Sequence, residues 1–407
     1  MLKKAELQTI IESESIRTLF HPIVSIKEKR IVGFEALSRG INNGSGSIIS
    51  PIDMFKCAQL NDLNLELDRL CRKIAIKQYQ AKGMQDNFLL FVNFDPGILN
   101  KVRIGCGWMN KLIESYGIKP FNIAIEIVES KVETHNRLSA FVDLYREYGF
   151  HIVLDDFGAD HSNLNRILLV KPDIIKIDRE LTLNISRDYY KQAIVGSIVE
   201  LGNKIGSVCL AEGVETLDDI IMCHELGLDY FQGFFFSLPL VDPEDMYQPC
   251  TESMKEVTEK LFAHLSKIVI QKIDVQQKYK KLSYEISENI SKVKEKDFNS
   301  FLKQAIDKYI EIECMYIIDK KGVQISDSVC KSMSENQAGH FLFRPAKKGA
   351  DHSLKKYFYH MNIMKLKEFY TSPYISLATG SLCTTISKSF INDENNFYIL
   401  CIDFSIN

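Results

Sequence analysis

The stretch His151-Ile-Val-Leu-Asp-Asp-Phe-Gly158 decides the fold. Its first half is mostly apolar, which predicts a short buried strand, and Asp155 and Asp156 stand where that strand ends. Two neighbouring carboxylates cannot both stay ionised in a dry site unless a positive charge compensates them, and a divalent metal ion is the natural candidate. For this stretch taken alone, an Asp-Asp turn that caps a helix is the alternative.

Similar apolar runs recur along residues 1–250. The runs 19–26 and 31–37 flank a charged turn and predict a hairpin. Later runs each end at a polar or charged residue: 88–92 before Asn93, 122–125 before Glu126, 151–154 before Asp155, 173–175 before Lys176, 207–211 before Glu212 and 230–231 before Gln232. Helical spacing fills the segments between them, at 54–80, 136–148, 189–201 and 217–226.

Alternating strands and helices predict a parallel sheet, and about eight such units in roughly 250 residues predict a (β/α)₈ barrel. In that fold the active site lies at the carboxyl ends of the strands. One polar residue at a strand end is easily a cap or a surface residue. Six in a row, each at the same end of its strand, favour a catalytic site.

The residue types indicate the chemistry of this site. Glu35, Asn93, Glu126, Asp155 and Asp156 offer the hard oxygen ligands that Mg²⁺, Mn²⁺ or Ca²⁺ prefers. Histidine and cysteine are missing from these strand ends, which argues against zinc. Two such ions can activate a water and stabilise the leaving oxygen of a phosphodiester.

Two cationic residues accompany the oxygen ligands. Lys176, among the carboxylates, is expected to hold the attacking water or the phosphate, and a purely structural buried ion pair is its alternative. Arg39 is placed to bind a phosphate, and its alternative is a solvated loop arginine.

Composition sets further bounds. The 407 residues predict two or more domains, and 45% hydrophobic with 25% charged residues is typical of globular proteins. No stretch approaches an uncharged membrane span and the N-terminus lacks a signal-peptide core, so we expect a cytoplasmic protein. Ten scattered cysteines without a C-x-x-C pair indicate neither a zinc site nor a disulfide framework.

Charge is distributed unevenly along the chain. Residues 251–407 hold 23 Lys and Arg against 19 Asp and Glu, a balance of +4, and the remaining 27 and 34 give residues 1–250 a balance of −7. An acidic first part argues against binding of duplex nucleic acid.

Seven motifs, in order along the chain, resemble the signature of the EAL-domain family of cyclic di-GMP phosphodiesterases. They are Glu35-Ala-Leu-Ser-Arg39, Val92-Asn93, Glu126-Ile-Val-Glu129, Asp155-Asp-Phe-Gly158, Lys176-Ile-Asp178, Ala211-Glu-Gly-Val-Glu215 and Gln232-Gly-Phe-Phe-Phe236. The resemblance covers about residues 15–245 and implies a modified TIM-like (β/α)₈ barrel whose first strand is antiparallel to the rest, as the predicted hairpin requires.

The resemblance also implies roles and ligands. The family's metal ligands correspond to Glu35, Asn93, Glu126 and Asp155, and the ligand of a second metal corresponds to Asp156. The groups that orient and deprotonate the water resemble Lys176 and Glu212, and Gln232 resembles a residue that completes the site. Contacts to base and phosphate resemble Leu37 and Arg39, and Glu129 resembles a residue that supports a loop. Mg²⁺ or Mn²⁺ is then the expected cofactor, with Ca²⁺ binding but inhibiting, and the reaction is hydrolysis of cyclic di-GMP to linear pGpG. A receptor that binds but barely cleaves cyclic di-GMP, and an enzyme acting on another phosphodiester, are the alternatives.

One loop departs from the family pattern. Active members usually carry Gly-Tyr-Ser-Ser-Leu where residues 160–164 read Asp-His-Ser-Asn-Leu, so Asp160 and His161 replace glycine and tyrosine. We expect this change to affect turnover.

The pattern changes after the barrel, and we expect domains at 1–250, 251–299 and 300–407. Apolar residues spaced by three and four from Met254 to Val293 predict a long connecting helix, which we expect to pair in a homodimer. Residues 300–407 predict a small α+β domain with strands at 314–319, 323–325, 374–387 and 397–404, and they resemble PAS-like or Cache-like sensor modules. A ligand or protein partner of this domain and a purely structural role both stay open.

Overall fold

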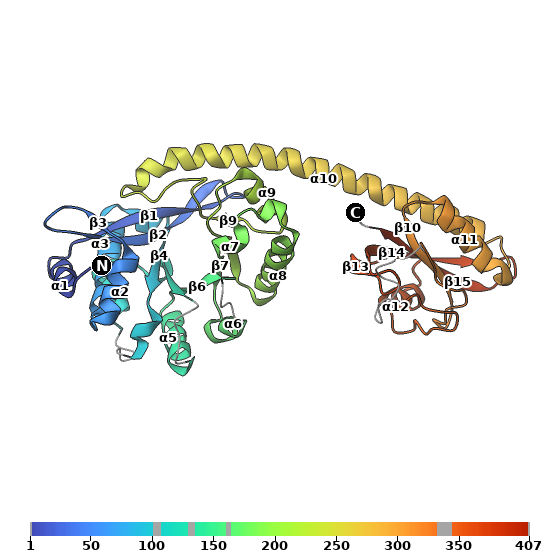
Figure 1. The fold of residues 1–407 in the computed structure, drawn as a ribbon, viewed down its shortest axis with the longest axis horizontal. Coiled ribbons are helices and arrows are strands. Elements are labelled where there is room, and N and C mark those ends of the chain that lie inside the picture. The colour runs from blue at the N-terminus through green and yellow to red at the C-terminus, as the bar shows by residue number, and fades with distance from the viewer. Residues whose placement is uncertain (1, 101–106, 129–134, 160–163, 332–343, 406–407) are drawn as a thin grey trace. The chain divides into compact units, whose positions relative to one another are not determined.

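The computed structural model describes residues 2–100, 107–128, 135–159, 164–331 and 344–405. The chain forms two compact units, residues 1–264 and 265–407 (Figure 1). Each unit has its own sheet, of nine strands in the first and six in the second.

The first unit is a closed barrel. Its strands are β1 (Ile16–Ser25), β2 (Arg30–Ile41), β4 (Leu89–Phe94), β5 (Ile123–Val128), β6 (His151–Phe157), β7 (Ile174–Ile177), β8 (Val208–Ala211) and β9 (Tyr230–Phe231), and β3 (Ile48–Ile49) extends the edge of β2. Their order is β1-β9-β8-β7-β6-β5-β4-β2, and pairing of β1 with β2 closes the ring. β1 is antiparallel to both neighbours, while β2 and the strands from β4 to β9 run parallel, which confirms the predicted barrel.

Helices surround this barrel: α1 (Lys4–Glu12), α2 (Pro51–Leu60), α3 (Asn64–Ala81), α4 (Trp108–Ser115), α5 (His135–Glu147), α6 (Asn165–Val170), α7 (Arg179–Thr182), α8 (Tyr189–Ile205) and α9 (Leu217–Glu225). The helical segment predicted at 54–80 is in fact two helices. Ser50 caps the first by accepting from the Asp53 amide, and Asp62, with φ of +62°, breaks the run between them.

The second unit is an antiparallel sheet with helices. Its strands are β10 (Ile312–Asp319), β11 (Val329–Cys330), β12 (Glu368–Tyr370), β13 (Tyr374–Ile375), β14 (Leu382–Ile391) and β15 (Phe397–Ser405), in the order β11-β10-β15-β14-β12 with β13 beside β14. The helices are α11 (Phe298–Lys308) and α12 (Lys356–Ile363), together with the end of α10 (Tyr247–Ile290). Helix α10 is the predicted connecting helix, and its 44 residues begin in the first unit and end in the second.

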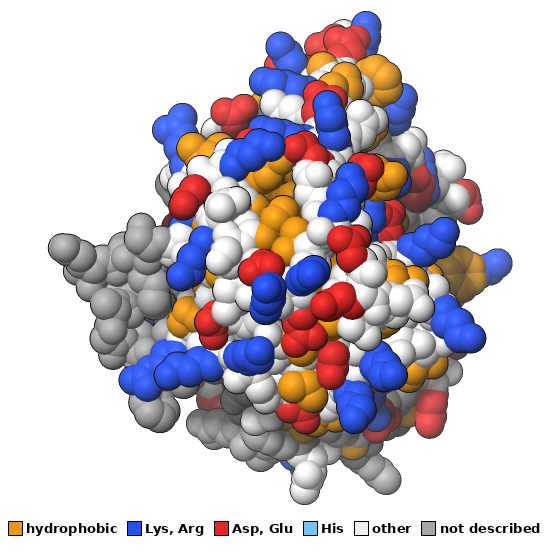
Figure 2. All heavy atoms as spheres, turned by 90° about the vertical axis from the view of Figure 1, so that its right-hand side faces the viewer, with side chains coloured by type: hydrophobic (Ala, Val, Ile, Leu, Met, Phe, Trp, Pro, Cys, Tyr) orange, Lys and Arg blue, Asp and Glu red, His pale blue; other side chains and the backbone are white. Residues whose placement is uncertain are grey.

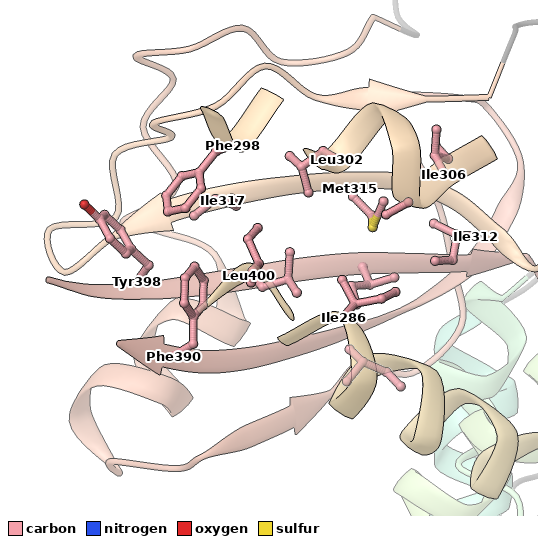
Figure 3. Packing of buried hydrophobic residues seen from close by; sticks show 14 of the residues in the cluster. Ile286, Phe298, Leu302, Ile306, Ile312, Met315, Ile317, Phe390, Tyr398 and Leu400 are labelled. Carbon is pink, nitrogen blue, oxygen red and sulfur yellow. The ribbon is translucent and has the colours of Figure 1, made fainter. Parts of the chain in front are cut away.

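Alternation along β15 gives this sheet two different faces. Leu400 and Ile402 point to one face, where they pack with Phe298, Ile286 and other apolar residues of α10 and α11 (Figure 3). Cys401 lies on the opposite face, with Tyr316 and Tyr357. Because side chains alternate between faces, Asp403 lies on this second face too.

Two predictions for this unit are wrong in detail. The strand predicted at 374–387 is interrupted, because the Ser376 amide donates to the Ser381 carbonyl and Gly380, with φ of +77°, reverses the chain. The segment 323–325 forms isolated bridges in place of a strand, between Ile318 and Gln324 and between Val323 and Asp351.

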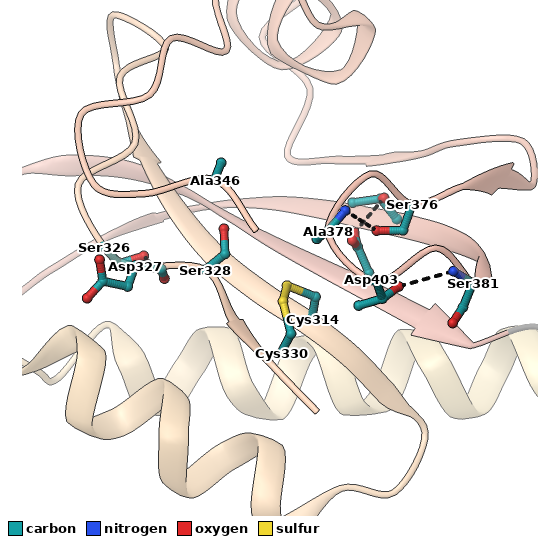
Figure 4. The surroundings of a disulfide bond; sticks show 12 residues. Cys314, Ser326, Asp327, Ser328, Cys330, Ala346, Ser376, Ala378, Ser381 and Asp403 are labelled. Atoms are coloured by element: carbon teal, nitrogen blue, oxygen red, sulfur yellow. Dashed lines mark hydrogen bonds between the residues drawn. A yellow bond between two sulfur atoms is a disulfide. The ribbon is translucent and has the colours of Figure 1, made fainter. Parts of the chain in front are cut away.

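The sequence indicates no disulfide framework, but the structure contains one disulfide, between Cys314 and Cys330 (Figure 4). The two residues lie directly opposite each other in the antiparallel pairing of β10 with β11, a proximity that their spacing in the sequence does not reveal. The other described cysteines are free and buried, as expected of small hydrophobic residues.

The surface of the second unit is mixed in charge. Figure 2 shows Lys and Arg side chains interspersed with Asp and Glu on one face, with small apolar patches between them. The described residues on this face therefore form no continuous basic stripe of the kind that binds duplex nucleic acid. Within the described residues, no helix combines the length and apolarity that crossing a membrane requires.

Candidate metal centre and substrate pocket

The site residues lie at one end of the barrel because of the two-residue period of its strands. Phe91, Ala124, Val153 and Leu210 form a buried layer inside the barrel, and Ile174 packs against it. Two positions later on the same face of each strand, or directly after it, come Asn93, Glu126, Asp155, Glu212 and Lys176. The pairing of Asn93 with Glu126 in register places the strand ends side by side.

Lys176 is the centre of this group. Its side chain is only 1% exposed, and Nζ lies 2.6 Å from Glu212 Oε1 and 2.7 Å from Glu126 Oε1. Asp155 Oδ1 is 3.1 Å away and Glu35 Oε2 is 3.4 Å away. Four carboxylates, carried on or directly after four different strands, therefore converge on one ammonium group.

The electrostatics of the cluster follow from an excess of negative charge. Burial alone would lower the pKa of Lys176, but the four carboxylates raise it well above its usual range. Burial raises the pKa of Glu126 and of Glu212 well above the usual range despite Lys176. Burial also opposes ionisation of Glu35, yet Lys176 and two side-chain amides lower its pKa. One lysine cannot compensate four carboxylates, so the cluster retains protons unless another cation is present.

The two amides come from Asn93 and Gln232. Asn93 Nδ2 donates to Glu35 Oε1 at 3.1 Å, and Gln232 Nε2 donates to Glu35 Oε2 at 2.8 Å. Gln232 Nε2 also lies 2.9 Å from Nδ1 of His21, a residue that the motif analysis missed. Burial lowers the pKa of His21 to about 4, so its neutral ring accepts this bond.

The donor set fits a hard cation. Among the described residues, neither Glu126 Oε2 nor Gln232 Oε1 has a hydrogen-bond partner, although both atoms are buried. Oxygens of Asp155, Asp156 and Glu212 also lie within 4.8 Å of one another. Buried oxygens without donors are costly unless a cation satisfies them, and oxygen ligands of this kind suit Mg²⁺ or Mn²⁺.

A β-bulge positions Asp156. The pairing of β6 with β7 shifts register between Leu154 and Phe157, and Asp156 has a φ of +54°. A bulge re-aims the side chain that it displaces, so Asp155 and Asp156 both reach the site although they are adjacent in the chain. Burial, with Asp155 and Asp178 nearby, raises the pKa of Asp156 to about 6.

A cavity of about 470 Å³ adjoins the carboxylates, and Leu37 and Arg39 are among the residues that line it. Arg39 is half-buried, and its Nη1 donates to the Ser38 carbonyl at 2.9 Å. The cavity also contains a buried pair, Asp68 with Arg72, that the motif analysis missed. Their four-residue spacing on an otherwise apolar helix face was the available signal.

Some predicted residues lie outside the described part of the chain. These are Glu129 and the loop residues Asp160, His161, Ser162 and Asn163. Of the motif residues left without a role, Asp178 caps α7 by accepting from the Glu180 amide at 2.6 Å, and Glu215 accepts from Arg179 at 2.7 Å. Both are structural contacts at the edge of the site.

The chain is similar to several known proteins. The uncharacterized EAL-domain containing protein YkuI of Bacillus subtilis is 24% identical over 412 residues, which cover 98% of this chain and 97% of YkuI. The crystal structure of YkuI with cyclic di-GMP and calcium matches the full length of both chains with a TM-score of 0.82 at 24% identity, which shows a common fold.

Two further similarities are confined to the barrel. The probable cyclic di-GMP phosphodiesterase PdeI of Escherichia coli is 31% identical over 227 residues, which are 54% of this chain and 28% of PdeI. BlrP1 of Klebsiella pneumoniae, in complex with manganese and cyclic di-GMP, matches 56% of each chain with a TM-score of 0.51 at 31% identity. The EAL domain family itself matches residues 4–239. With the motifs at the strand ends of a barrel of the expected topology, this chain belongs to the EAL domain family.

Proposed function

We propose that this chain is a metal-dependent phosphodiesterase that hydrolyses cyclic di-GMP to linear pGpG. The observation that carries the proposal is the set of four carboxylates around Lys176, beside a cavity lined by Leu37 and Arg39. The names of PdeI as a probable phosphodiesterase and of BlrP1 as a complex with cyclic di-GMP support the same substrate.

Mg²⁺ or Mn²⁺ would be held by Glu35, Asn93, Glu126 and Asp155, with Asp156 available to a second ion. When bound, such an ion supplies Lewis-acid stabilisation of the phosphoryl oxygens and lowers the pKa of a water. The similar structures are complexes with calcium or manganese, which supports a divalent ion as the cofactor.

The remaining roles fall to other residues of the chain. Glu212 is the general base in this proposal, because its carboxylate lies in the cluster 2.6 Å from Lys176 Nζ and burial raises its pKa above the usual range, which favours uptake of a proton. Lys176 holds the carboxylates in place and offers its ammonium group to the attacking water. Gln232 orients Glu35, Leu37 contacts a base and Arg39 binds a phosphate.

One assay separates this proposal from its alternatives. The purified chain is incubated with cyclic di-GMP and Mn²⁺ or Mg²⁺, and linear pGpG is measured by chromatography. Binding without product would support a receptor of low activity, and neither binding nor product would favour another phosphodiester. With Ca²⁺ in place of Mn²⁺ we expect binding but little product, because the larger ion accepts irregular coordination and polarises water less.

The substitution Glu35→Ala tests the metal site. It removes one ligand of the ion and the acceptor of the Asn93 and Gln232 amides, so we expect hydrolysis to fall by at least about 10²-fold at limiting Mn²⁺. Glu200→Ala on the exposed face of α8 is the matched control and should leave turnover unchanged. Near-normal turnover of Glu35→Ala at limiting metal would refute the assignment.

We further infer that the second unit regulates the barrel, with α10 as the connection. The helix is continuous over residues 247–290, Leu261 is buried in its first half and Ile286 is buried near its end. Val269, between them, is 53% exposed, so Val269→Pro should break the helix with little loss of packing, whereas Val269→Ala should not. We expect turnover to change in the proline variant alone, and equal turnover in both variants would contradict regulation through this helix.

A further inference from the structure

A second cavity, of about 800 Å³, lies in the C-terminal unit and takes no part in the proposed hydrolysis. It lies on the second face of the sheet, where Tyr316 of β10, Tyr374 of β13 and Asp403 of β15 line it. Its volume is within the range of about 300–1,000 Å³ that is typical of small-molecule sites. The polar groups of the cavity determine which ligand can bind, and two hydrogen-bond chains connect them.

The first hydrogen-bond chain ends at Asp403, which is only 2% exposed. Thr385 Oγ1 donates to Asp403 Oδ1 at 2.7 Å, and the Tyr374 hydroxyl lies 2.6 Å from Thr385 Oγ1 and 3.4 Å from Asp403 Oδ1. A hydroxyl has one proton. Since Thr385 gives its proton to the carboxylate, Tyr374 must donate as well, and its oxygen is left to accept.

The second chain begins at the backbone. Gln324 Nε2 donates to the carbonyl of Ser326 at 2.8 Å, which identifies Gln324 Oε1 as the acceptor of His352 Nε2–H at 2.8 Å. Burial lowers the pKa of His352, so its ring is neutral and Nδ1 accepts from the Tyr357 hydroxyl at 2.6 Å. Tyr357 in turn accepts from the Tyr316 hydroxyl at 2.9 Å. The Tyr316 proton is thus committed, and its oxygen too can only accept.

Both chains lead to the same result. Asp403, Tyr316 and Tyr374 contribute three oxygens that can accept hydrogen bonds, because the protons of both tyrosine hydroxyls are already committed to bonds within the protein. The groups that stabilise the Asp403 charge are neutral hydroxyls of Thr385, Tyr374 and Ser376, and burial still raises its pKa to about 6. Figure 4 shows Asp403 with Ser376 nearby. At neutral pH the cavity therefore contains a buried carboxylate without a cationic partner among these groups.

We propose that this cavity binds a small organic cation, whose ammonium or guanidinium group donates hydrogen bonds to Asp403, Tyr316 and Tyr374. Phe369, Tyr370 and Leu377 line the same cavity and offer apolar contacts for the rest of the ligand. Exposed Arg344, Lys355 and Lys356 also line it, so an anion that binds through these cationic side chains is the opposite outcome of the test.

Three compounds that differ only in their head group test the proposal on the full chain. Phenethylamine carries an ammonium, 2-phenylethanol a neutral hydroxyl and 3-phenylpropionate a carboxylate. Isothermal titration calorimetry at pH 7.5, without cyclic di-GMP or metal, should show that phenethylamine binds about tenfold or more tightly than the other two, since a hydrogen bond to a charged group stabilises a complex strongly. The amine should also raise the melting temperature.

Two variants locate the binding. Asp403→Asn should remove the preference for the amine, and Tyr316→Phe should weaken amine binding without changing the weak binding of the alcohol. Asp393→Asn, in the exposed turn between β14 and β15, is the matched control and should bind like the wild type. The proposal is overturned if the wild type prefers the carboxylate, fails to discriminate among the three, or binds none of them at millimolar concentration. Because no hydrolysis is measured, failure here leaves the proposed phosphodiesterase activity untouched.

Discussion

Lys176 in the barrel and Asp403 in the C-terminal unit are both ionisable side chains buried on a strand, with 1% and 2% of their surface exposed. Lys176 lies within 3.4 Å of four carboxylates, and its pKa is raised well above the usual range. Asp403 has neutral hydroxyls as partners, and its pKa is raised to about 6, against its charged form. The charge of Lys176 is thus stabilised by neighbouring charges within its own site, whereas the charge of Asp403 is stabilised by neutral hydroxyls.

Removal of Lys176 should have the largest effect on stability. Lys176→Met leaves four converging carboxylates without their ammonium group, so the free energy of unfolding in EDTA at pH 8 should fall by about 3–5 kcal/mol. Urea unfolding followed by the fluorescence of Trp108, the chain's single tryptophan, reports on the barrel. Lys204→Met, at a pair whose side chains are each 69% exposed, should change stability by less than about 0.5 kcal/mol. A Lys176→Met barrel as stable as the wild type would mean that the carboxylates protonate and need no ammonium.

Asp403 should give a smaller effect, and one that depends on pH. Its pKa of about 6 in the folded chain lies above the value of 3.8 that is usual for an aspartate in an unfolded chain, so the folded state binds this proton more tightly. The contribution of Asp403 to the free energy of unfolding is therefore fully present below about pH 4. It falls by about 3 kcal/mol as the pH rises through 6. The difference between wild type and Asp403→Asn in urea unfolding at about pH 4.5 and 7.5 isolates this contribution. A difference that does not change with pH would contradict the assignment.

Thr385→Val should have the smallest effect. It removes the strongest neutral donor to Asp403, so stability should fall by about 1.5 kcal/mol at pH 7.5, where the carboxylate is charged. The loss should be smaller at pH 4.5, where Asp403 is protonated. Equal losses at both values would indicate that Thr385 contributes packing rather than stabilisation of charge.

The barrel and the members of its site could be predicted from the sequence because one rule covers them all. A buried strand in this fold alternates inward and outward, so a polar residue at the end of each apolar run must reach the same rim. This rule predicts from the sequence alone that Asn93, Glu126, Asp155 and Lys176 lie close together. The rule does not cover the bulge that brings Asp156 to the same site as Asp155, because a register shift depends on the neighbouring strand.

The contacts that the sequence could not reveal join residues far apart in the chain. His21 meets Gln232 across the closure of the barrel, and Cys314 meets Cys330 only through the register of two strands. In the C-terminal unit, residues 374–387 read in the sequence as one continuous strand, although a turn interrupts them in the structure. The cavity behind it is formed by β10, β13, β15 and α12 together, so no single stretch predicts it. The homodimer and the sensor-like identity of this unit stay predictions.

The position of Lys176 has a consequence for the order in which the protein matures. Its ammonium is an internal counterion that the chain carries from synthesis, whereas a metal ion must be acquired from solution. Small metal-binding domains whose ligands are held apart by repulsion fold only when the ion arrives. Here the covalently attached cation already draws the four carboxylates together, so we expect the barrel to fold first and to load its metal afterwards.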